Sequence, residues 1–367
     1  MDNCVIPHGY KATALGIIPQ EWEVMLLGNL SNSISSGRNK HRDAHGQYPV
    51  FGSTGIIGYS STYEYEGPVI LVARVGANAG TLNFASGQYD VSDNTLIITI
   101  KQNVYDYNFA YNQLTHYKLN KLVFGSGQPL ITSKQLKNIR IPVPPLAEQR
   151  KIAEVLGVWD KAIEKQARLI EKLALRKRAL MQRLLSAKLR LPGFSEPWKK
   201  VKLGDVAELY QPQTIQSEDL SQTGYPVYGA NGLIGYYNNY NHEYPQVVIT
   251  CRGSSCGTVN FTPGKCWITG NAMVLNVDNN RDVNKSFFYY LISNSSFVNL
   301  ISGSGQPQIV RQPLLKFELR IPPLKEQTAI AEVLTAADRE IDLAKEKLER
   351  LRRQKRGLMQ QLLTGKK

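Results

Sequence analysis

Residues 146–185 read LAEQRKIAEVLGVWDKAIEKQARLIEKLALRKRALMQRLL, and residues 324–363 read LKEQTAIAEVLTAADREIDLAKEKLERLRRQKRGLMQQLL. In both stretches apolar positions recur at alternating steps of four and three residues, which is the heptad seam of a coiled coil. The two seams correspond position for position, with an offset of 178 residues. The first contains Ile152, Leu156, Trp159, Ile163, Ile170, Leu173, Leu180 and Leu184, and the second contains Ile330, Leu334, Ile341, Leu348, Leu351, Leu358 and Leu362. The pattern predicts two related helices.

The two helices are predicted to pack on each other in opposite directions. Each stretch lacks proline and should form a helix about 60 Å long, with an apolar stripe that a partner must bury. Only residues 186–194 separate the first helix from the segment that follows, so parallel pairing would require the chain to return about 60 Å. Antiparallel pairing needs no return. We therefore expect an antiparallel coiled coil with one globular domain at each end, rather than two helices that pack separately on their own domains.

The segments that precede the helices are also duplicated. Residues 48–59 (YPVFGSTGIIGY) and 225–236 (YPVYGANGLIGY) keep three glycines in register, which indicates tight turns in a β-rich domain. Predicted strands cover residues 69–73, 96–100, 247–250 and 273–277, and predicted helices cover residues 107–120 and 285–294. We expect an α+β fold, a tandem duplication of a mainly β domain plus a long helix. The predicted domains are residues 1–145 and 189–323, and the predicted spacer helices are residues 146–188 and 324–367.

Composition points to an intracellular partner with negative charge. The 367 residues include 44 Lys and Arg against 30 Asp and Glu, a net charge of +14, and nucleic acid is the leading polyanion for such a chain. No apolar run reaches the roughly 18 residues of a membrane span. The N-terminus lacks the pattern of a signal peptide. Four cysteines suit a reducing compartment, so we expect a cytoplasmic protein.

Motifs that carry catalysis are missing from the sequence. It contains no phosphate-binding loop, and its Gly-Ser-Gly segments do not open a dinucleotide-binding unit. No Asn-Pro-Pro-aromatic or Asp-Pro-Pro-aromatic string of the amino-methyltransferase kind is present. The spacing of Cys251, Cys256 and Cys266 fits no standard metal site. We therefore expect no catalytic residue, no metal and no cofactor in this chain.

Loops rich in Gly, Ser, Asn, Gln and Tyr, with single basic residues among them, are suited to contact phosphates and base edges. The candidate DNA-binding residues are Arg38, Lys40, Arg42, Arg74, Gln128, Lys134, Gln213, Arg252, Lys285, Gln306 and Arg311. Each of them could equally be a solvated loop residue. Matching loops differ between the halves, since Arg74 corresponds to Cys251. The two domains should therefore read different sequences.

Several motifs together carry a family resemblance. Tyr10-Lys11 is followed by Gly16-Ile17-Ile18-Pro19 and Trp22, and Gly-Ser-Gly-Gln-Pro begins at Gly125 and Gly303. Pro-Pro-Leu-x-Glu-Gln opens both long helices, and Leu-Met-Gln-x-Leu-Leu ends both. Over nearly its full length the chain resembles the specificity subunit of Type I restriction-modification systems. The resemblance implies two target-recognition domains separated by two helices.

The resemblance also implies a function and partners. Each domain would read one half of a bipartite DNA site with a fixed gap, and the coiled coil would dock two modification subunits, one for each half. Those subunits would carry S-adenosylmethionine and methylate adenine, restriction subunits would cleave DNA, and this subunit would catalyse nothing. Two alternatives remain from the residues alone. One is a DNA-processing enzyme whose acidic cluster comes from distant segments, and the other is an adaptor whose domains bind proteins.

Overall fold

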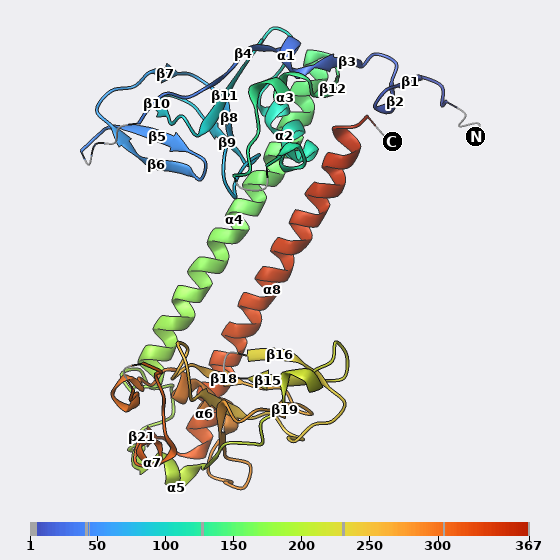
Figure 1. Cartoon of the computed structure of the whole chain (residues 1–367). Helices are drawn as coiled ribbons and strands as arrows, with labels where there is room; N and C mark the ends of the chain where they lie inside the picture. Colours follow the sequence, from blue (N-terminus) through green and yellow to red (C-terminus); the bar gives the residue numbers. More distant parts are fainter. Residues whose placement is uncertain are drawn as a thin grey trace. The chain divides into compact units, whose positions relative to one another are not determined.

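The computed structural model describes residues 6–40, 43, 45–125, 128–229, 232–303 and 305–365. Its two long helices are α4 (Leu146–Leu184) and α8 (Leu324–Leu362), of 39 residues each (Figure 1). The chain divides into two compact units. Unit 1 comprises residues 1–167 and 347–367, and unit 2 comprises residues 168–346. Each unit therefore holds one globular domain together with a part of both long helices.

The globular domain of unit 1 is built on two sheets. Its elements are β1 (Tyr10–Thr13), β2 (Gly16–Pro19), β3 (Glu23–Leu26), α1 (Leu27–Leu30), β4 (Ser31–Ser36), β5 (Tyr48–Gly52), β6 (Gly55–Ser60), β7 (Tyr65–Glu66), β8 (Val69–Ala73), β9 (Leu82–Ala85), β10 (Gln88–Val91), β11 (Thr95–Ile100), α2 (Tyr107–Tyr117), the 3₁₀ helix η1 (Leu119–Leu122), α3 (Ser133–Lys137) and β12 (Arg140–Val143). One sheet has the strand order β4-β11-β8-β9 and the other β6-β5-β10-β7. The pairs β1-β2 and β12-β3 complete the domain.

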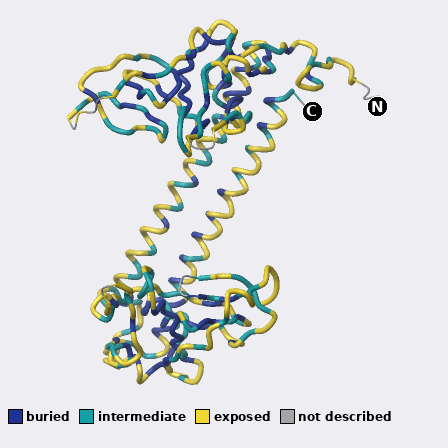
Figure 2. The backbone as a smooth tube through the Cα atoms, in the orientation of Figure 1, coloured by how far each residue is buried: buried dark blue, intermediate teal, exposed yellow. Residues whose placement is uncertain are grey.

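Strand β8 explains how the first domain is layered. All five of its residues are buried, as expected for a strand covered on both faces. Ile70 and Val72 point into the larger core, which includes Phe109 of α2. Their neighbours Val69 and Leu71 point into a second core against the other sheet. The burial map shows the dark buried segments gathered inside the domain (Figure 2).

Unit 2 repeats this architecture. Its elements are β13 (Lys199–Lys202), α5 (Leu203–Val206), β14 (Glu208–Tyr210), η2 (Ser217–Asp219), β15 (Tyr225–Gly229), β16 (Gly232–Tyr237), β17 (Val247–Thr250), β18 (Val259–Phe261), β19 (Trp267–Ile268), β20 (Ala272–Asn276), α6 (Lys285–Ser293), η3 (Val298–Leu300), α7 (Arg311–Leu315) and β21 (Glu318–Ile321). The sheet β14-β20-β17-β18 corresponds to β4-β11-β8-β9. The sheet β16-β15-β19 corresponds to three strands of the second sheet of unit 1. The predicted duplication of an α+β domain is therefore confirmed.

Glycine forms the hairpin turns that the repeated sequence predicted. Gly52 pairs with Gly55 where β5 turns into β6, and Gly229 pairs with Gly232 at the equivalent turn of unit 2. The second glycine of each pair has a positive φ, +99° at Gly55 and +108° at Gly232, which other residues rarely adopt. The glycines kept in register therefore serve the backbone of a hairpin.

The long helices pack antiparallel, as predicted. In unit 1, Met359 near the end of α8 joins the core that contains Leu156 near the start of α4. In unit 2, Leu173 of α4 packs with Ile341 and Ala344 of α8. Residue numbers thus rise along one helix as they fall along the other. Every side chain predicted for the seam is buried or of intermediate exposure.

Each domain contacts its own segment of this helix pair. The core of the first domain includes Ile152 and Leu156 of α4 and Met359 of α8. The core of the second includes Leu184 of α4 and Leu334 of α8. None of the described helices combines the length and the apolar composition needed to cross a membrane.

Candidate DNA interface

Two loops that are distant in the sequence meet in unit 1. The loop at residues 74–81 follows β8, and Gly125-Ser-Gly-Gln-Pro precedes α3. The amide of Gly76 donates to the Pro129 carbonyl at 2.8 Å, and the amide of Ile131 donates to the Arg74 carbonyl at 2.9 Å. Arg74 and Gln128 therefore belong to one surface.

Arg38 joins this surface through the turn at residues 91–95. The backbone amide of Arg38 donates to the Val91 carbonyl at 3.0 Å, and that of Arg74 donates to the Asn94 carbonyl at 2.9 Å. The Arg74 guanidinium also donates to the Ser36 hydroxyl at 3.2 Å, which orients it. The Arg38 side chain is 81% exposed and lies 3.8 Å from the Glu64 carboxylate, a distance that leaves its donors accessible to a phosphate. Lys40 is exposed as well.

The same loops meet in unit 2. The amide of Gly253 donates to the Pro307 carbonyl at 3.0 Å, and that of Ile309 donates to the Cys251 carbonyl at 2.9 Å. This brings Arg252 beside the loop that carries Gln306. The carbonyl of Gln213 accepts the indole N–H of Trp267 at 3.3 Å, next to the turn that precedes β20. The amide of Cys251 donates to Asn271 in that turn, at 3.1 Å.

The remaining candidates fall into three groups. Lys134 in α3 and Arg311 at the start of α7 are exposed and follow the Gly-Ser-Gly-Gln-Pro loops directly. Lys285 is partly exposed, and its ammonium already pairs with the Asp278 carboxylate and donates to the Pro245 carbonyl at 2.8 Å. These partners give Lys285 an internal structural role. Arg42 lies outside the described residues.

A buried histidine supports the loop of unit 2, and sequence reasoning missed it. His242 and Tyr210 share a hydrogen bond of 2.9 Å between the imidazole Nε2 and the phenol oxygen. The imidazole Nδ1 lies 2.6 Å from the Asn241 amide oxygen, so Nδ1 is the donor and Nε2 accepts from Tyr210. Burial lowers the pKa of His242. The pair holds the end of β14, from which the segment carrying Gln213 leaves, and nothing equivalent in the first half signalled it.

Thiol chemistry is disfavoured in unit 2. Burial raises the pKa of Cys251 to about 11 and also raises the pKa of Cys256 and of Cys266. These thiols are therefore protonated near neutral pH, whereas nucleophiles and metal ligands need the thiolate. Within the part of the chain that the structure describes, no group of three or more His, Cys, Asp or Glu side chains could hold a metal ion.

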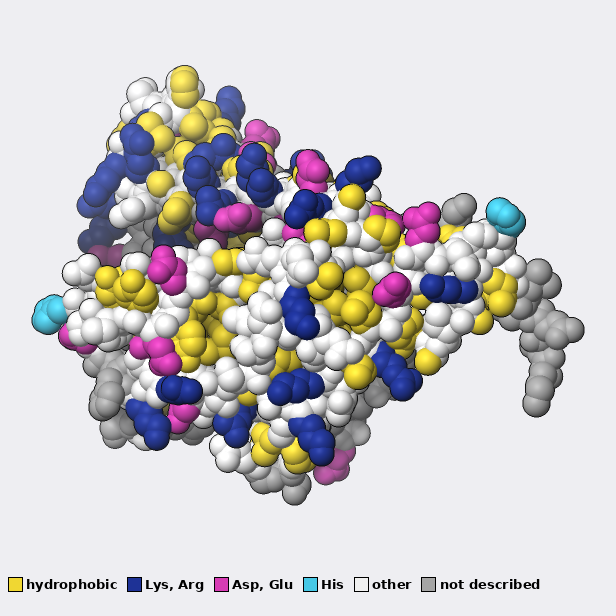
Figure 3. Space-filling view, turned by 90° about the horizontal axis from the view of Figure 1, so that it is seen from above, with side chains coloured by type: hydrophobic (Ala, Val, Ile, Leu, Met, Phe, Trp, Pro, Cys, Tyr) yellow, Lys and Arg dark blue, Asp and Glu magenta, His cyan; other side chains and the backbone are white. Residues whose placement is uncertain are grey.

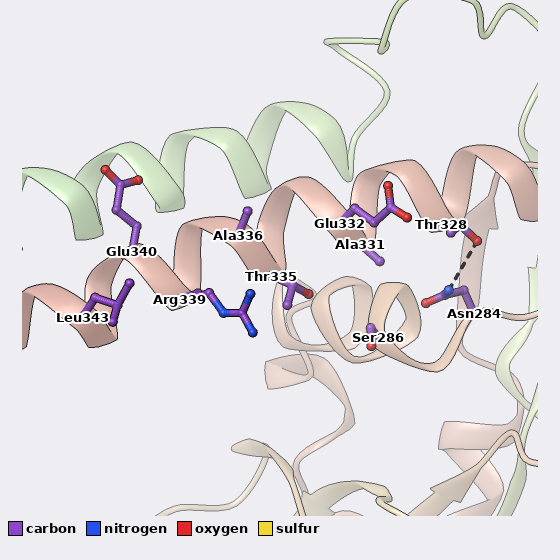
Figure 4. Close-up of a pocket in the computed structure, with 10 residues that line it drawn as sticks. All are labelled: Asn284, Ser286, Thr328, Ala331, Glu332, Thr335, Ala336, Arg339, Glu340 and Leu343. Carbon is purple, nitrogen blue, oxygen red and sulfur yellow. Dashed lines mark hydrogen bonds between the residues drawn. The ribbon is translucent and has the colours of Figure 1, made fainter.

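Each unit also has a groove between its domain and a long helix. In unit 2 a groove of about 620 Å³ lies between α6 and α8, where Glu332, Arg339 and Leu343 line it (Figure 4). In unit 1 a groove of about 520 Å³ lies between α2 and α4, lined by Glu154 and Lys161 among others. Glu154 corresponds to Glu332, and Lys161 to Arg339, at the offset of 178 residues. The duplication has therefore preserved the place of the groove and this one pair of opposite charges.

Exposed apolar side chains line both grooves. Val158 of α4 is 62% exposed in the first groove, and Leu343 of α8 is 60% exposed in the second. Phe84 adds an aromatic ring that is 38% exposed to the first groove. Figure 4 shows Leu343 and Arg339 on the α8 side of the second groove, and Asn284 donating to Thr328 where α6 begins. Such concave surfaces with mixed character are suited to bind a protein.

Comparisons with known proteins identify the family of the chain. A family model described as Type I restriction modification DNA specificity domain matches residues 19–174 and again residues 195–353. The Type I restriction enzyme MjaVIII specificity subunit of Methanocaldococcus jannaschii is 24% identical over 406 residues, which covers 95% of this chain and 93% of that protein. The putative type I restriction enzyme MjaX specificity subunit of the same organism is 26% identical over 414 residues, which covers 98% of this chain and 96% of that protein.

Two solved structures share the fold. The S subunit of a Type I restriction-modification system from M. genitalium has a TM-score of 0.66 and 20% identity, and covers 93% of this chain and 96% of that chain. A chain from a study of complex assembly and conformational transition of the type I R-M system has a TM-score of 0.58 and 19% identity. It covers 95% of this chain and 99% of that chain.

Proposed function

Since this chain belongs to the Type I restriction-modification DNA specificity family, we propose that its two domains read the two halves of one bipartite DNA site. The chain is a DNA sequence-recognition subunit of a family that is generally non-catalytic. One observation carries the assignment of the reading surface. In both units the loop that follows the central buried strand is hydrogen-bonded to the Gly-Ser-Gly-Gln-Pro loop.

The two surfaces offer different side chains to DNA. Unit 1 presents the guanidinium groups of Arg38 and Arg74, which are suited to the acceptor pair on the major-groove edge of guanine. Both units present a carboxamide from the Gly-Ser-Gly-Gln-Pro loop, Gln128 or Gln306, and a carboxamide is suited to adenine. Unit 2 adds the carboxamide of Gln213 and has the guanidinium of Arg252. We therefore expect two dissimilar half-sites, with a larger contribution from guanine in the half read by unit 1.

Positive charge would supply the part of the affinity that does not depend on sequence. The net charge is +14, and Lys and Arg side chains recur across the face shown in Figure 3. Each phosphate contact releases condensed counterions, so affinity should fall steeply as salt concentration rises. Binding that barely changes with salt would favour the protein-binding adaptor instead.

The two grooves are the proposed docking sites for modification subunits. Because they occupy equivalent places and share a corresponding glutamate and basic residue, each should accept the same surface of an identical partner, which gives two modification subunits for each chain. In this proposal the partners carry S-adenosylmethionine and methylate adenine, and restriction subunits supply cleavage. This chain needs no cofactor of its own.

The decisive experiment is selection of bound duplexes from a random library, with this chain mixed with its modification subunit at moderate salt. We expect two short, dissimilar motifs separated by one fixed gap. One continuous motif, or none, would refute bipartite reading. Nuclease activity of the isolated chain with Mg²⁺ would instead support an enzyme.

The docking sites are tested by charge reversal within the grooves. Arg339→Glu should weaken binding of the modification subunit in unit 2, and Lys161→Glu should do the same in unit 1. The double variant should then bind none. Titration of the chain with modification subunit, followed by mass measurement, gives the stoichiometry. Unchanged binding of two subunits by the double variant would contradict docking in the grooves.

A further inference from the structure

A buried glutamine in the first turn of each long helix forms hydrogen bonds to the backbone of the globular domain. The side chain of Gln149 is fully buried. Its oxygen accepts the backbone N–H of Asp106 at 2.8 Å, and its nitrogen donates to the carbonyls of Val104 at 2.9 Å and Pro144 at 2.8 Å. Three hydrogen bonds therefore run from one side chain of α4 to two separate segments of the chain.

Gln327 repeats this arrangement in α8. Its oxygen accepts the backbone N–H of Asn284 at 2.9 Å, and its nitrogen donates to the carbonyls of Asp282 and Pro322, both at 2.9 Å. Its exposed fraction is 1%. The bonded atoms correspond one for one between the units, so the duplication has kept the complete set of bonds.

The residue that each glutamine holds is the N-cap of the domain's main helix. The Asp106 carboxylate accepts the amides of Asn108 and Phe109 and so begins α2. The Asn284 side chain accepts the amide of Phe287 and begins α6 in the same way. The glutamine therefore ties the start of the long helix to the start of the helix that packs on the domain's central sheet.

The preceding glutamate holds a second point of the same domain. The indole N–H of Trp22 donates to the Glu148 carboxylate at 3.1 Å, and that of Trp198 donates to the Glu326 carboxylate at 3.2 Å. In unit 2 the guanidinium of Arg190 also binds Glu326 in a bidentate manner, at 2.6 and 2.8 Å. Each domain is thus attached to its long helix at two separate places, which prevents rotation about either one.

We propose that Gln149 and Gln327 are positioning residues that set the orientation of each recognition domain on its long helix, and thereby the length of the gap between the half-sites. This inference rests on the proposed function. Both side chains are buried and fully bonded within their own unit, so they do not select bases. They should affect the spacing of the two motifs and leave the motifs themselves unchanged.

The test compares gap preferences in the assembled complex with the modification subunit. Gln149→Glu keeps the shape and the acceptor for Asp106, but it replaces two N–H donors with a carboxylate oxygen that faces the carbonyls of Val104 and Pro144. Gln354→Glu is the matched control, because it makes the same charge change at an exposed position of α8. Duplex selection is run for the wild type and for both variants.

We expect the wild type and Gln354→Glu to select one gap. Gln149→Glu should select the same two motifs at more than one gap, with the preference for the original gap reduced by about tenfold or more. Lowering the pH should restore part of that preference, because a protonated carboxyl regains one donor. A merely structural role would change the amount of folded complex but not the gap that the folded complex selects.

Gln149→Met provides a second variant, which removes the polar group without burying a charge, and it should also relax the gap. A folded variant that keeps the single gap, or one that alters the motifs, would overturn the inference. Failure of both variants to fold would also overturn it, since the residue would then be a folding anchor. If the wild type itself selects no bipartite site, it is the proposed function that fails.

Discussion

The ammonium of Lys355 in α8 lies 2.6 Å from the carboxylate of Asp160 in α4. The residues offset by 178 positions form the same pair with the helices exchanged, because Lys177 of α4 lies 2.5 Å from Asp338 of α8. Lys355 lies at the heptad spacing between the seam residues Leu351 and Leu358, and Lys177 lies likewise between Leu173 and Leu180. The side chains of Lys355 and Lys177 are only 15% and 19% exposed. A polar residue at such a position favours one register over others. A shifted register would leave both lysines half-buried without a partner.

The two ion pairs should contribute unequally to stability. Asp338 also accepts the phenol of Tyr290 at 2.7 Å, whereas the Asp160 side chain is 55% exposed. We expect Asp338→Ala to lower the free energy of unfolding by about 1–3 kcal/mol, because it removes the carboxylate that accepts from both the half-buried Lys177 ammonium and the buried Tyr290 phenol. Asp160→Ala should lower it by about 1 kcal/mol or less. Urea unfolding measures both, and an equal or reversed order would contradict the assignment.

Interruption of the coiled coil should separate recognition from spacing. Leu173 is buried against Ile341 and Ala344, and proline there costs about 3 kcal/mol because it breaks the helix. We expect Leu173→Pro to abolish selection of two motifs at one gap. Leu173→Ala should leave the helix intact while it lowers the free energy of unfolding by about 2 kcal/mol or more. Duplex selection with the proline variant provides the check, and a fixed gap there would argue against a spacer role.

Sequence reading by Arg74 should be local. Its guanidinium is oriented by Ser36 on the proposed surface of unit 1. We expect Arg74→Ala to relax one base position of one half-site, with a loss of about 1–3 kcal/mol in binding free energy. The other half-site should stay unchanged. Lys285→Ala is the control, since it removes an internal ion pair with Asp278 and should alter stability without altering any base preference.

Acid should weaken unit 2 through His242. Burial lowers the pKa of this imidazole from its ordinary value of 6.5. As pH falls below that value, the unfolded chain binds a proton that the folded chain does not, so the free energy of unfolding decreases until the lower folded pKa is reached. Above pH 6.5 this stabilisation is fully present.

The effect is isolated by comparison with His242→Gln, in which that position no longer titrates. The urea midpoint of the wild type should fall more than that of the variant between pH 7.5 and pH 5.5, values chosen around the ordinary imidazole pKa of about 6.5. Identical pH dependence in the two proteins would mean that the imidazole is not held neutral in the folded state.

The long helices, the duplication and the antiparallel pairing could all be predicted from the sequence. Helical periodicity depends on residues that are close in the sequence, and the offset of 178 residues follows from comparison of the two stretches of sequence alone. The direction of pairing followed from chain length, because only residues 186–194 are available to turn the chain. The strands at residues 69–73 and 247–250 were predicted with the bounds observed for β8 and β17. Both runs are short and rich in β-branched residues and lie between turn signals, and these features together favour a buried strand over a helix.

Contacts between distant residues were decided only by the tertiary structure. Strand β10 pairs in parallel with β5, with Asp90 beside Val50, and no pattern within either segment predicts that pairing. Lys285 is a predicted DNA contact by residue type and loop position, and only the fold shows that its ammonium pairs with Asp278. Gln149 could be recognised as a repeated letter, but not as the side chain that binds the N-cap of α2. The sequence by itself therefore determined which segments are equivalent and which are helical, since those properties depend on neighbours along the chain. The packed structure determined which polar groups are exposed to solvent and which hold the domains, because burial and hydrogen bonding depend on neighbours in space.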